Sequence, residues 1–209
     1  DWVCFGEAED IMEQLVSDLR ADRRGQRYQG GAGTNMERVK IPRFELLPDV
    51  NDYATMALQF SRGCPFKCEF CDIIEIYGRV PRTKTPSQVC AELAEVERLG
   101  FQGYIFLVDD NFIGNKRKAK EMLAELATWN REHHYPFRYY TEASINLADD
   151  DELLERMRQA SRAVLGPAHG RGLRGLHVPL LRAVRGRDPG RPAEAGRRAA
   201  ERTAEKRIR

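Results

Sequence analysis

Three cysteines in a short run are the residues of this chain best suited to chemistry. Cys64, Cys68 and Cys71 form a C-x3-C-x2-C pattern within Ser-Arg-Gly-Cys-Pro-Phe-Lys-Cys-Glu-Phe-Cys-Asp, and no fourth cysteine is nearby. Three thiolates at this spacing can hold three corners of a cubic iron–sulfur cluster and leave the fourth iron open. A ferredoxin-type cluster has four protein thiolates, so the missing fourth one disfavours a simple electron-transfer protein.

A zinc site and a disulfide are the alternative uses of closely spaced thiols. A structural zinc site needs four closed ligands. Cys4, in an apolar strand-like run, and Cys90, on a helical face, are expected to be small buried hydrophobic residues instead. His133 and His134 lack ligand spacing relative to the cysteines and are expected to be solvated. We expect a cytoplasmic chain, in which such thiols indicate metal or redox use rather than a disulfide.

The segment Gly-Cys-Pro-Phe-Lys-Cys-Glu-Phe-Cys resembles the signature of radical S-adenosylmethionine (radical SAM) enzymes. The resemblance implies that Cys64, Cys68 and Cys71 bind a [4Fe–4S] cluster whose open iron chelates the amino and carboxylate groups of S-adenosyl-L-methionine. It also implies reductive cleavage of that cofactor, with electrons from a reductant such as flavodoxin or ferredoxin. Phe70 would pack near the adenine, and its alternative role is core packing.

Apolar runs alternate with helical patterns, which predicts an α/β fold with a parallel sheet. The expected strands are residues 2–6, 55–60, 104–108 and 137–141, and the expected helices are 8–20, 85–99, 116–131 and one beginning after Asp149. Thr85, Pro86 and Gln88 predict a capping box with proline at the first helical position. Asp149 is predicted to cap the last helix, with Glu152 three residues further on.

Helical spacing predicts which side chains of these helices are buried. The residues placed on the buried faces are Ile11, Leu15, Val16 and Leu19 in the first helix, Val89, Leu93 and Val96 in the second, and Met122, Leu123, Leu126 and Trp129 in the third.

Polar segments follow three of the expected strands. The cysteine loop follows 55–60, Asp-Asp-Asn (109–111) follows 104–108, and Glu-Ala-Ser (142–144) follows 137–141. In a barrel of parallel strands these ends share one face, so the segments predict one site, although the aspartates could also be helix caps. The resemblance implies contacts to S-adenosylmethionine from Asp110, Asn111, Glu142 and Ser144, and it assigns no catalytic residue. Asp-Asp-Asn stands where the family has Gly-Gly-Glu.

The resemblance covers about residues 1–159 and implies a domain organisation. Residues 1–20, with Gly6 and Glu7, resemble the strand–Gly-Glu–helix unit that closes a cobalamin-binding Rossmann-like domain. Residues 21–54 are expected to be a linker. Residues 55–160 are expected to be the N-terminal half of an incomplete, TIM-like (β/α) partial barrel. The groups that grip the corrin would lie upstream, so we expect the chain to be a fragment.

Composition changes abruptly near residue 160. Residues 1–159 contain 21 Lys and Arg, 28 Asp and Glu, and every aromatic residue, for a net charge of −7. Residues 160–209 contain 13 basic and 4 acidic residues, for a net charge of +9, with 12 Arg to 1 Lys. We expect 161–209 to be an Arg-, Gly- and Ala-rich disordered tail produced by a frame change or a misjoined gene end. The alternative is a genuine regulatory tail.

The expected function follows from "CDIIEIYGRVPRTKT", "VDDNFIGNK" and "TEASINLADDDELL", which resemble the cobalamin-dependent subgroup that contains the hopanoid C-2 methyltransferase. The resemblance implies methyl transfer to an unactivated carbon, for example of a hopanoid-like lipid. It also implies cobalamin bound through the upstream domain, and we expect this truncated form to be inactive. The alternative is a protein with a structural metal site whose Arg-rich tail binds nucleic acid or acidic partners. The tail lacks the aromatic residues that stacking on single strands requires, and no apolar run has the length of a membrane span.

Overall fold

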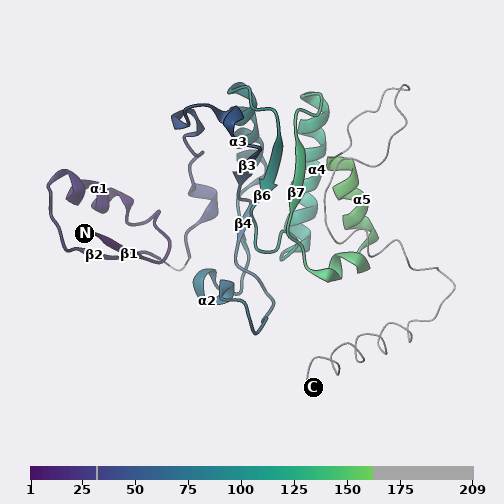
Figure 1. Cartoon of the computed structure of the whole chain (residues 1–209). Helices are drawn as coiled ribbons and strands as arrows, with labels where there is room; N and C mark the ends of the chain where they lie inside the picture. Colours follow the sequence, from purple (N-terminus) through teal and green to yellow (C-terminus); the bar gives the residue numbers. More distant parts are fainter. Residues whose placement is uncertain (32, 162–209) are drawn as a thin grey trace, which may run out of the picture. The chain divides into compact units, whose positions relative to one another are not determined.

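The computed structural model describes residues 1–31 and 33–161 (Figure 1). Apart from Ser161, the predicted tail lies outside these residues, and so does its expected frame-change origin. None of the described helices combines the length and the apolar character that crossing a membrane requires.

A three-stranded parallel sheet forms the centre of the core. Strands β3 (Thr55–Leu58), β6 (Tyr104–Leu107) and β7 (Arg138–Thr141) are neighbours in that order and run in the same direction. Helix α3 (Pro86–Arg98) connects β3 to β6, and helix α4 (Lys116–Glu132) connects β6 to β7 (Figure 1). Parallel neighbours require such crossover connections, so the predicted α/β fold with a parallel sheet is confirmed.

The two faces of this sheet differ because successive side chains of a strand point to opposite sides. One face is buried and consists of Met56, Leu58, Ile105, Leu107, Tyr139 and Thr141. The other face carries half-buried and exposed side chains, among which Phe106 and Tyr140 stack with ring centroids 4.5 Å apart. The core therefore lies on one side of the sheet.

Helix α3 begins and ends as the sequence predicts. The Thr85 side chain accepts a hydrogen bond from the backbone N–H of Gln88, and the Gln88 side chain accepts one from the backbone N–H of Thr85. Gly100 follows the helix with a φ of +78°, a conformation that glycine adopts at little cost. The predicted buried face is confirmed, since Val89, Leu93 and Val96 have no exposed surface.

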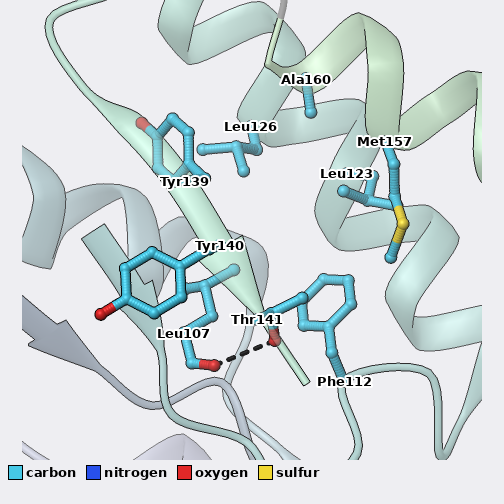
Figure 2. Close-up of a pocket in the computed structure, with 9 residues that line it drawn as sticks. All are labelled: Leu107, Phe112, Leu123, Leu126, Tyr139, Tyr140, Thr141, Met157 and Ala160. Atoms are coloured by element: carbon cyan, nitrogen blue, oxygen red, sulfur yellow. Dashed lines mark hydrogen bonds between the residues drawn. The ribbon is translucent and has the colours of Figure 1, made fainter. Parts of the chain in front are cut away.

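Helices α4 and α5 (Asp151–Ala160) pack against each other and against the sheet. Between them, β6 and β7 lies a small apolar pocket, in which the only drawn hydrogen bond joins Thr141 Oγ1 to the Leu107 carbonyl (Figure 2). The pocket is part of the hydrophobic core. The predicted face of α4 is confirmed, and its buried members are Met122, Leu123, Leu126 and Trp129.

The predicted cap of the last helix is wrong by one residue. Asp150 caps α5, because its Oδ1 accepts a hydrogen bond from the backbone N–H of Leu153 at 3.0 Å. Asp149 instead ends the short 3-10 turn η4 (Ile145–Asp149), which delays the start of the helix. With Asp150 as the cap, Leu153 occupies the third helical position, so Glu152 does not complete a capping box and instead forms ion pairs with Lys120 and Arg156.

The N-terminal residues form a β–α–β unit. Strand β1 (Val3–Phe5) and strand β2 (Arg27–Gln29) are parallel, and helix α1 (Met12–Arg20) connects them. The helix begins later than predicted, because the N–H of Ile11 donates to the Ala8 carbonyl in a preceding turn.

Predicted burial in this unit is partly wrong. Val3, Cys4, Phe5 and Leu19 are exposed, although Ile11 is buried. The reason is that a sheet of two strands is too narrow to bury all of its apolar side chains. Cys4 is therefore not the small buried residue that the apolar run predicted.

The segment predicted to be a linker packs against the core at several points. Beyond β2 it contains the short 3-10 turns η1 (Met36–Arg38), η2 (Phe44–Leu46) and η3 (Val50–Asp52), each with one buried apolar side chain. The Gln88 side-chain amide also donates to the carbonyls of Met36, Glu37 and Val39. The helix cap thus also anchors the preceding segment.

Candidate functional site

The cysteine loop lies beyond the C-terminal end of β3. Short strands β4 (Ser61–Arg62) and β5 (Arg82–Thr83) pair in antiparallel fashion and close residues 63–81 into a loop that contains helix α2 (Ile73–Tyr77). The antiparallel pair brings the two ends of the loop together, so the loop is attached to the core at a narrow neck.

All three cysteines of the loop are free thiols. Cys68 is exposed, and Cys64 and Cys71 are partly exposed. The backbone N–H of Cys64 donates to the Gly78 carbonyl at 3.3 Å, and that of Cys71 donates to the Cys68 carbonyl at 3.2 Å. The thiols therefore share one hydrogen-bonded loop that solvent and cofactors can reach.

The donor set of the loop consists of three cysteine thiols, which is the ligand type that iron–sulfur clusters use. Within residues 1–31 and 33–161, no three His, Cys, Asp or Glu side chains gather around a point where one ion could bind. A cubane attaches each thiolate to a different iron, so the sulfurs need not converge on one point. Cys90 is confirmed as buried, and burial raises its pKa to about 12, which disfavours the thiolate form that binds metal.

The histidine pair does not lie in this loop. His133 follows the last residue of α4, where its Nδ1 contacts Glu97 and its ring stacks on Trp129 at 4.2 Å between ring centroids. Because β7 starts only after this point, the pair lies before the N-terminal end of a strand, whereas the cysteine loop follows the C-terminal end of one.

Gly63 is required at the neck of the loop. Its φ is +94°, and a Cβ there would lie 2.9 Å from the Gly78 carbonyl oxygen and 3.1 Å from that of Val80. Both a strained backbone and a clash with main-chain atoms oppose any side chain at this position.

We expect Gly63→Ala to destabilise the chain more than Gly100→Ala. Gly100 has a similar φ of +78°, but a Cβ there would meet nothing within 4 Å, so it controls for backbone strain alone. The strain costs about 1–2 kcal/mol at each position, and the clash at Gly63 should add at least about 1 kcal/mol. Urea unfolding followed by circular dichroism measures both variants, and equal losses would contradict the close approach at Gly63.

Asp109 joins the end of β6 to the neck of the cysteine loop. Its Oδ1 accepts hydrogen bonds from the backbone N–H groups of Phe60, at 3.0 Å, and Ser61. The residue is 1% exposed, and its Oδ2 has no hydrogen-bond partner among the described residues. Burial raises the pKa of Asp109 to about 7, although the two backbone hydrogen bonds act in the opposite direction.

Asn111 and Ser144 meet beside Cys64. Asn111 Oδ1 accepts a hydrogen bond from the Ser144 backbone N–H at 3.2 Å, and Asn111 Nδ2 lies 3.1 Å from Ser144 Oγ and 3.9 Å from Cys64 Sγ. Ser144 Oγ also donates to Asn146 Oδ1 at 2.6 Å, a contact that the sequence did not indicate. The structure thus brings together residues that follow all three strands of the sheet.

The other candidate residues are more exposed than Asn111 and Ser144. Asp110 and Glu142 are exposed residues, although partial desolvation of the Asp110 carboxyl group by its surroundings raises the pKa of Asp110 above its ordinary value. The Glu142 carbonyl accepts a hydrogen bond from the N–H of Phe112 at 2.9 Å. Phe70 is 91% exposed, so its alternative role in core packing is wrong. Contacts from these residues to a cofactor stay predictions.

The sequence model of the radical SAM superfamily matches residues 58–204. The chain is 46% identical to an uncharacterized methyltransferase of Synechocystis over 157 residues, which are 75% of the chain and 29% of that protein. It is 38% identical to the hopanoid C-2 methylase of Rhodopseudomonas palustris over 164 residues, which are 77% of the chain and 31% of that protein.

A weaker match is the bacteriochlorophyllide d C-8(2)-methyltransferase of Chlorobaculum tepidum, 24% identical over 173 residues, or 77% of the chain and 37% of that protein. Among solved structures, the radical S-adenosylmethionine methyltransferase TsrM of Kitasatospora setae matches with a TM-score of 0.57 and 16% identity. That match covers 75% of the chain and 35% of TsrM, and it supports the fold alone. The chain spans about a third of the length of the curated relatives that it matches.

Proposed function

The chain belongs to the radical SAM superfamily, and we propose that it provides part of a cobalamin-dependent methyltransferase that acts on an unactivated carbon. Family membership implies a [4Fe–4S] cluster and S-adenosylmethionine as cofactors. The observation that carries the proposal is the 38% identity with a hopanoid C-2 methylase, whose name places the methyl group on carbon 2 of a hopanoid. We infer a hopanoid-like lipid as the substrate class.

When bound, the cluster, S-adenosylmethionine and cobalamin would supply one-electron chemistry and a methyl group, which acid–base catalysis cannot provide at a carbon without an acidic proton. The chain's own residues would bind and orient these groups. Cys64, Cys68 and Cys71 would hold three irons as thiolates. Their position on an accessible loop supports this role, because a cofactor must reach the fourth iron.

Asn111 and Ser144 would bind the polar end of S-adenosylmethionine. The amide and the hydroxyl lie beside Cys64 and offer hydrogen-bond donors and acceptors of the kind that amino and carboxylate groups require. Asp110 and Glu142, which are exposed carboxyl groups on the same strand ends, would attract the positive amino group. Phe70 would cover the adenine, and its exposure leaves its ring free to do so.

Cobalamin binding is inferred from the N-terminal unit. The parallel strands β1 and β2 with α1 between them are consistent with the end of a Rossmann-like domain. The unit precedes the radical SAM core in the chain, as expected for a domain that supplies a second cofactor.

We expect residues 1–160 to support methyl transfer when they replace the matching segment of the Rhodopseudomonas hopanoid C-2 methylase. The anaerobically reconstituted chimera, given S-adenosylmethionine, reductant, cobalamin and a hopanoid, should yield 5′-deoxyadenosine and a methylated hopanoid, both measured by mass spectrometry. A chimera carrying Cys68→Ala is the matched control and should form neither product. Formation of 5′-deoxyadenosine that is indifferent to cobalamin, with no methyl group transferred, would move the chain to another radical SAM class.

A further inference from the structure

One buried carboxylate contacts both ends of the cysteine loop. Glu7 Oε1 lies 2.6 Å from Arg82 Nη2, and Glu7 Oε2 lies 2.7 Å from Arg62 Nη1 and 3.1 Å from Arg82 Nη1. The Glu7 side chain is 2% exposed, and the two arginine side chains are 14% and 20% exposed. Two guanidinium groups therefore share a single carboxylate in a site that water hardly reaches.

The two arginines mark the neck of the loop. Arg62 in β4 and Arg82 in β5 are directly paired across the antiparallel ladder, and Cys64 follows Arg62 by two residues. Two positive side chains placed directly opposite each other on paired strands repel each other. Glu7 offsets that repulsion, and Glu9 adds a contact to Arg62 Nη2 at 2.6 Å. Without Glu7, two poorly hydrated cations would face each other where the loop begins and ends.

Further hydrogen bonds extend this network to the rest of the loop. Arg82 donates to the Tyr77 carbonyl at the end of α2, at 3.2 Å, and to the Thr34 carbonyl at 2.7 Å. Arg62 donates to Gln59 Oε1 at 2.8 Å, and its guanidinium lies 5.8 Å from the centre of the Tyr77 ring. The carboxylate is thereby connected to Gln59 directly after β3, to both loop ends and to the helix within the loop.

Glu7 is charged under ordinary conditions. Burial opposes its ionisation, but the hydrogen bonds from Arg82 and Arg62 outweigh burial and hold the pKa of Glu7 below its ordinary value. A carboxylate paired in this way cannot be replaced by a neutral group without leaving charge unpaired in the interior.

We propose that Glu7 is a positioning residue which, through Arg62 and Arg82, holds the three cysteines of the loop ready for the cluster before the cluster binds. The proposal rests on the proposed function only in naming the cluster as the ligand. It also assigns a role to the Gly-Glu turn after β1: the turn couples the N-terminal β1–α1–β2 unit to the cluster loop of the core.

The test compares Glu7→Gln with Glu9→Gln in the full chain carrying Cys4→Ala and Cys90→Ala, so that only the loop thiols remain. In the metal-free protein, the rate of trypsin cleavage after Lys67 and the rate of thiol reaction with a disulfide reagent report the order of the loop. Both rates should rise at least about tenfold in Glu7→Gln, because one partner of a buried ion pair is lost. Iron per chain after anaerobic reconstitution should fall to less than about half. Glu9 is more exposed and contacts Arg62 alone, so Glu9→Gln should change each value less than about threefold.

A second variant separates positioning from charge balance. Glu7→Gln with Arg82→Gln removes one charge of each sign, so it should recover a native circular dichroism spectrum even if Glu7→Gln alone unfolds. We expect the loop of this double variant still to be cleaved rapidly by trypsin and its thiols still to react rapidly with the disulfide reagent. We also expect the double variant to bind little iron. Recovery of iron binding in the double variant, or rates in Glu7→Gln within a factor of two of the parent, would overturn it. A parent protein that binds no iron would instead refute the proposed cluster, and the cleavage and thiol rates would still decide the role of Glu7.

Discussion

Replacing Cys64, Cys68 or Cys71 by alanine will abolish stable binding of the iron–sulfur cluster, whereas replacing Cys4 or Cys90 will leave it intact. A cubane that already has one iron without a protein thiolate loses a second attachment in each loop variant. The two other thiols are unsuited to replace the missing ligand. Cys4 lies on β1, and Cys90 is buried in α3 with a pKa of about 12.

Anaerobic reconstitution followed by iron and sulfide assays measures this effect. The parent chain should bind about four irons, and each loop variant should retain well under half of that amount. The Cys4→Ala and Cys90→Ala variants are matched controls, because they remove a thiol without touching the loop. If either were needed as much as Cys68, the assignment of three cysteine ligands would be wrong.

The contribution of Asp109 to the free energy of unfolding should fall as the pH rises from about 4 to about 7, and Asp109→Asn will remove this pH-dependent contribution. Asp109 has a pKa of about 7 in the folded chain and an ordinary value near 4 when unfolded. Between these values the folded state binds more protons than the unfolded state, so this group's contribution decreases with increasing pH. The slope approaches about 1.4 kcal/mol per pH unit in the middle of that interval and vanishes above the folded pKa.

The asparagine variant isolates this effect because its side-chain oxygen can still accept the hydrogen bonds from Phe60 and Ser61. The asparagine NH2 group would take the place of Oδ2, which has no hydrogen-bond partner among the described residues. A buried NH2 donor left without an acceptor lowers the free energy of unfolding by about 1–3 kcal/mol. We therefore expect Asp109→Asn to be less stable than the parent at pH 5 and nearly equal to it at pH 8. Urea unfolding of the metal-free chain across this range measures the difference. A difference that does not change with pH would contradict the raised pKa.

Asp109→Ala provides the complementary comparison. It removes the acceptor itself, so the backbone N–H groups of Phe60 and Ser61 are left without a partner at the neck of the loop. The expected loss is about 2–4 kcal/mol at pH 5. A loss no larger than that of Asp109→Asn would mean that these two hydrogen bonds contribute nothing to stability.

Local patterns in the sequence were sufficient to predict the helices and strands at the centre of the core. The capping box at Thr85 and Gln88 involves residues three apart, and the buried face of α3 repeats every three or four residues. Each can be recognised within a short window, because helix geometry alone determines which side chains meet. The spacing of the cysteines is local in the same way, so the three thiols could be recognised as a set from the sequence, and their binding of a cluster stays a prediction.

The tertiary structure alone decided which distant side chains contact the two ends of that loop. Asp109 reaches Ser61 across 48 residues, and Glu7 reaches Arg62 and Arg82 across 55 and 75 residues. The sequence indicated Asp109 only as a polar residue after a strand, and Glu7 only as part of a Gly-Glu turn. It likewise predicted burial for Cys4, which the narrow two-stranded sheet leaves exposed. Side-chain partners and burial at such separations depend on how distant elements pack, and no local periodicity encodes that arrangement.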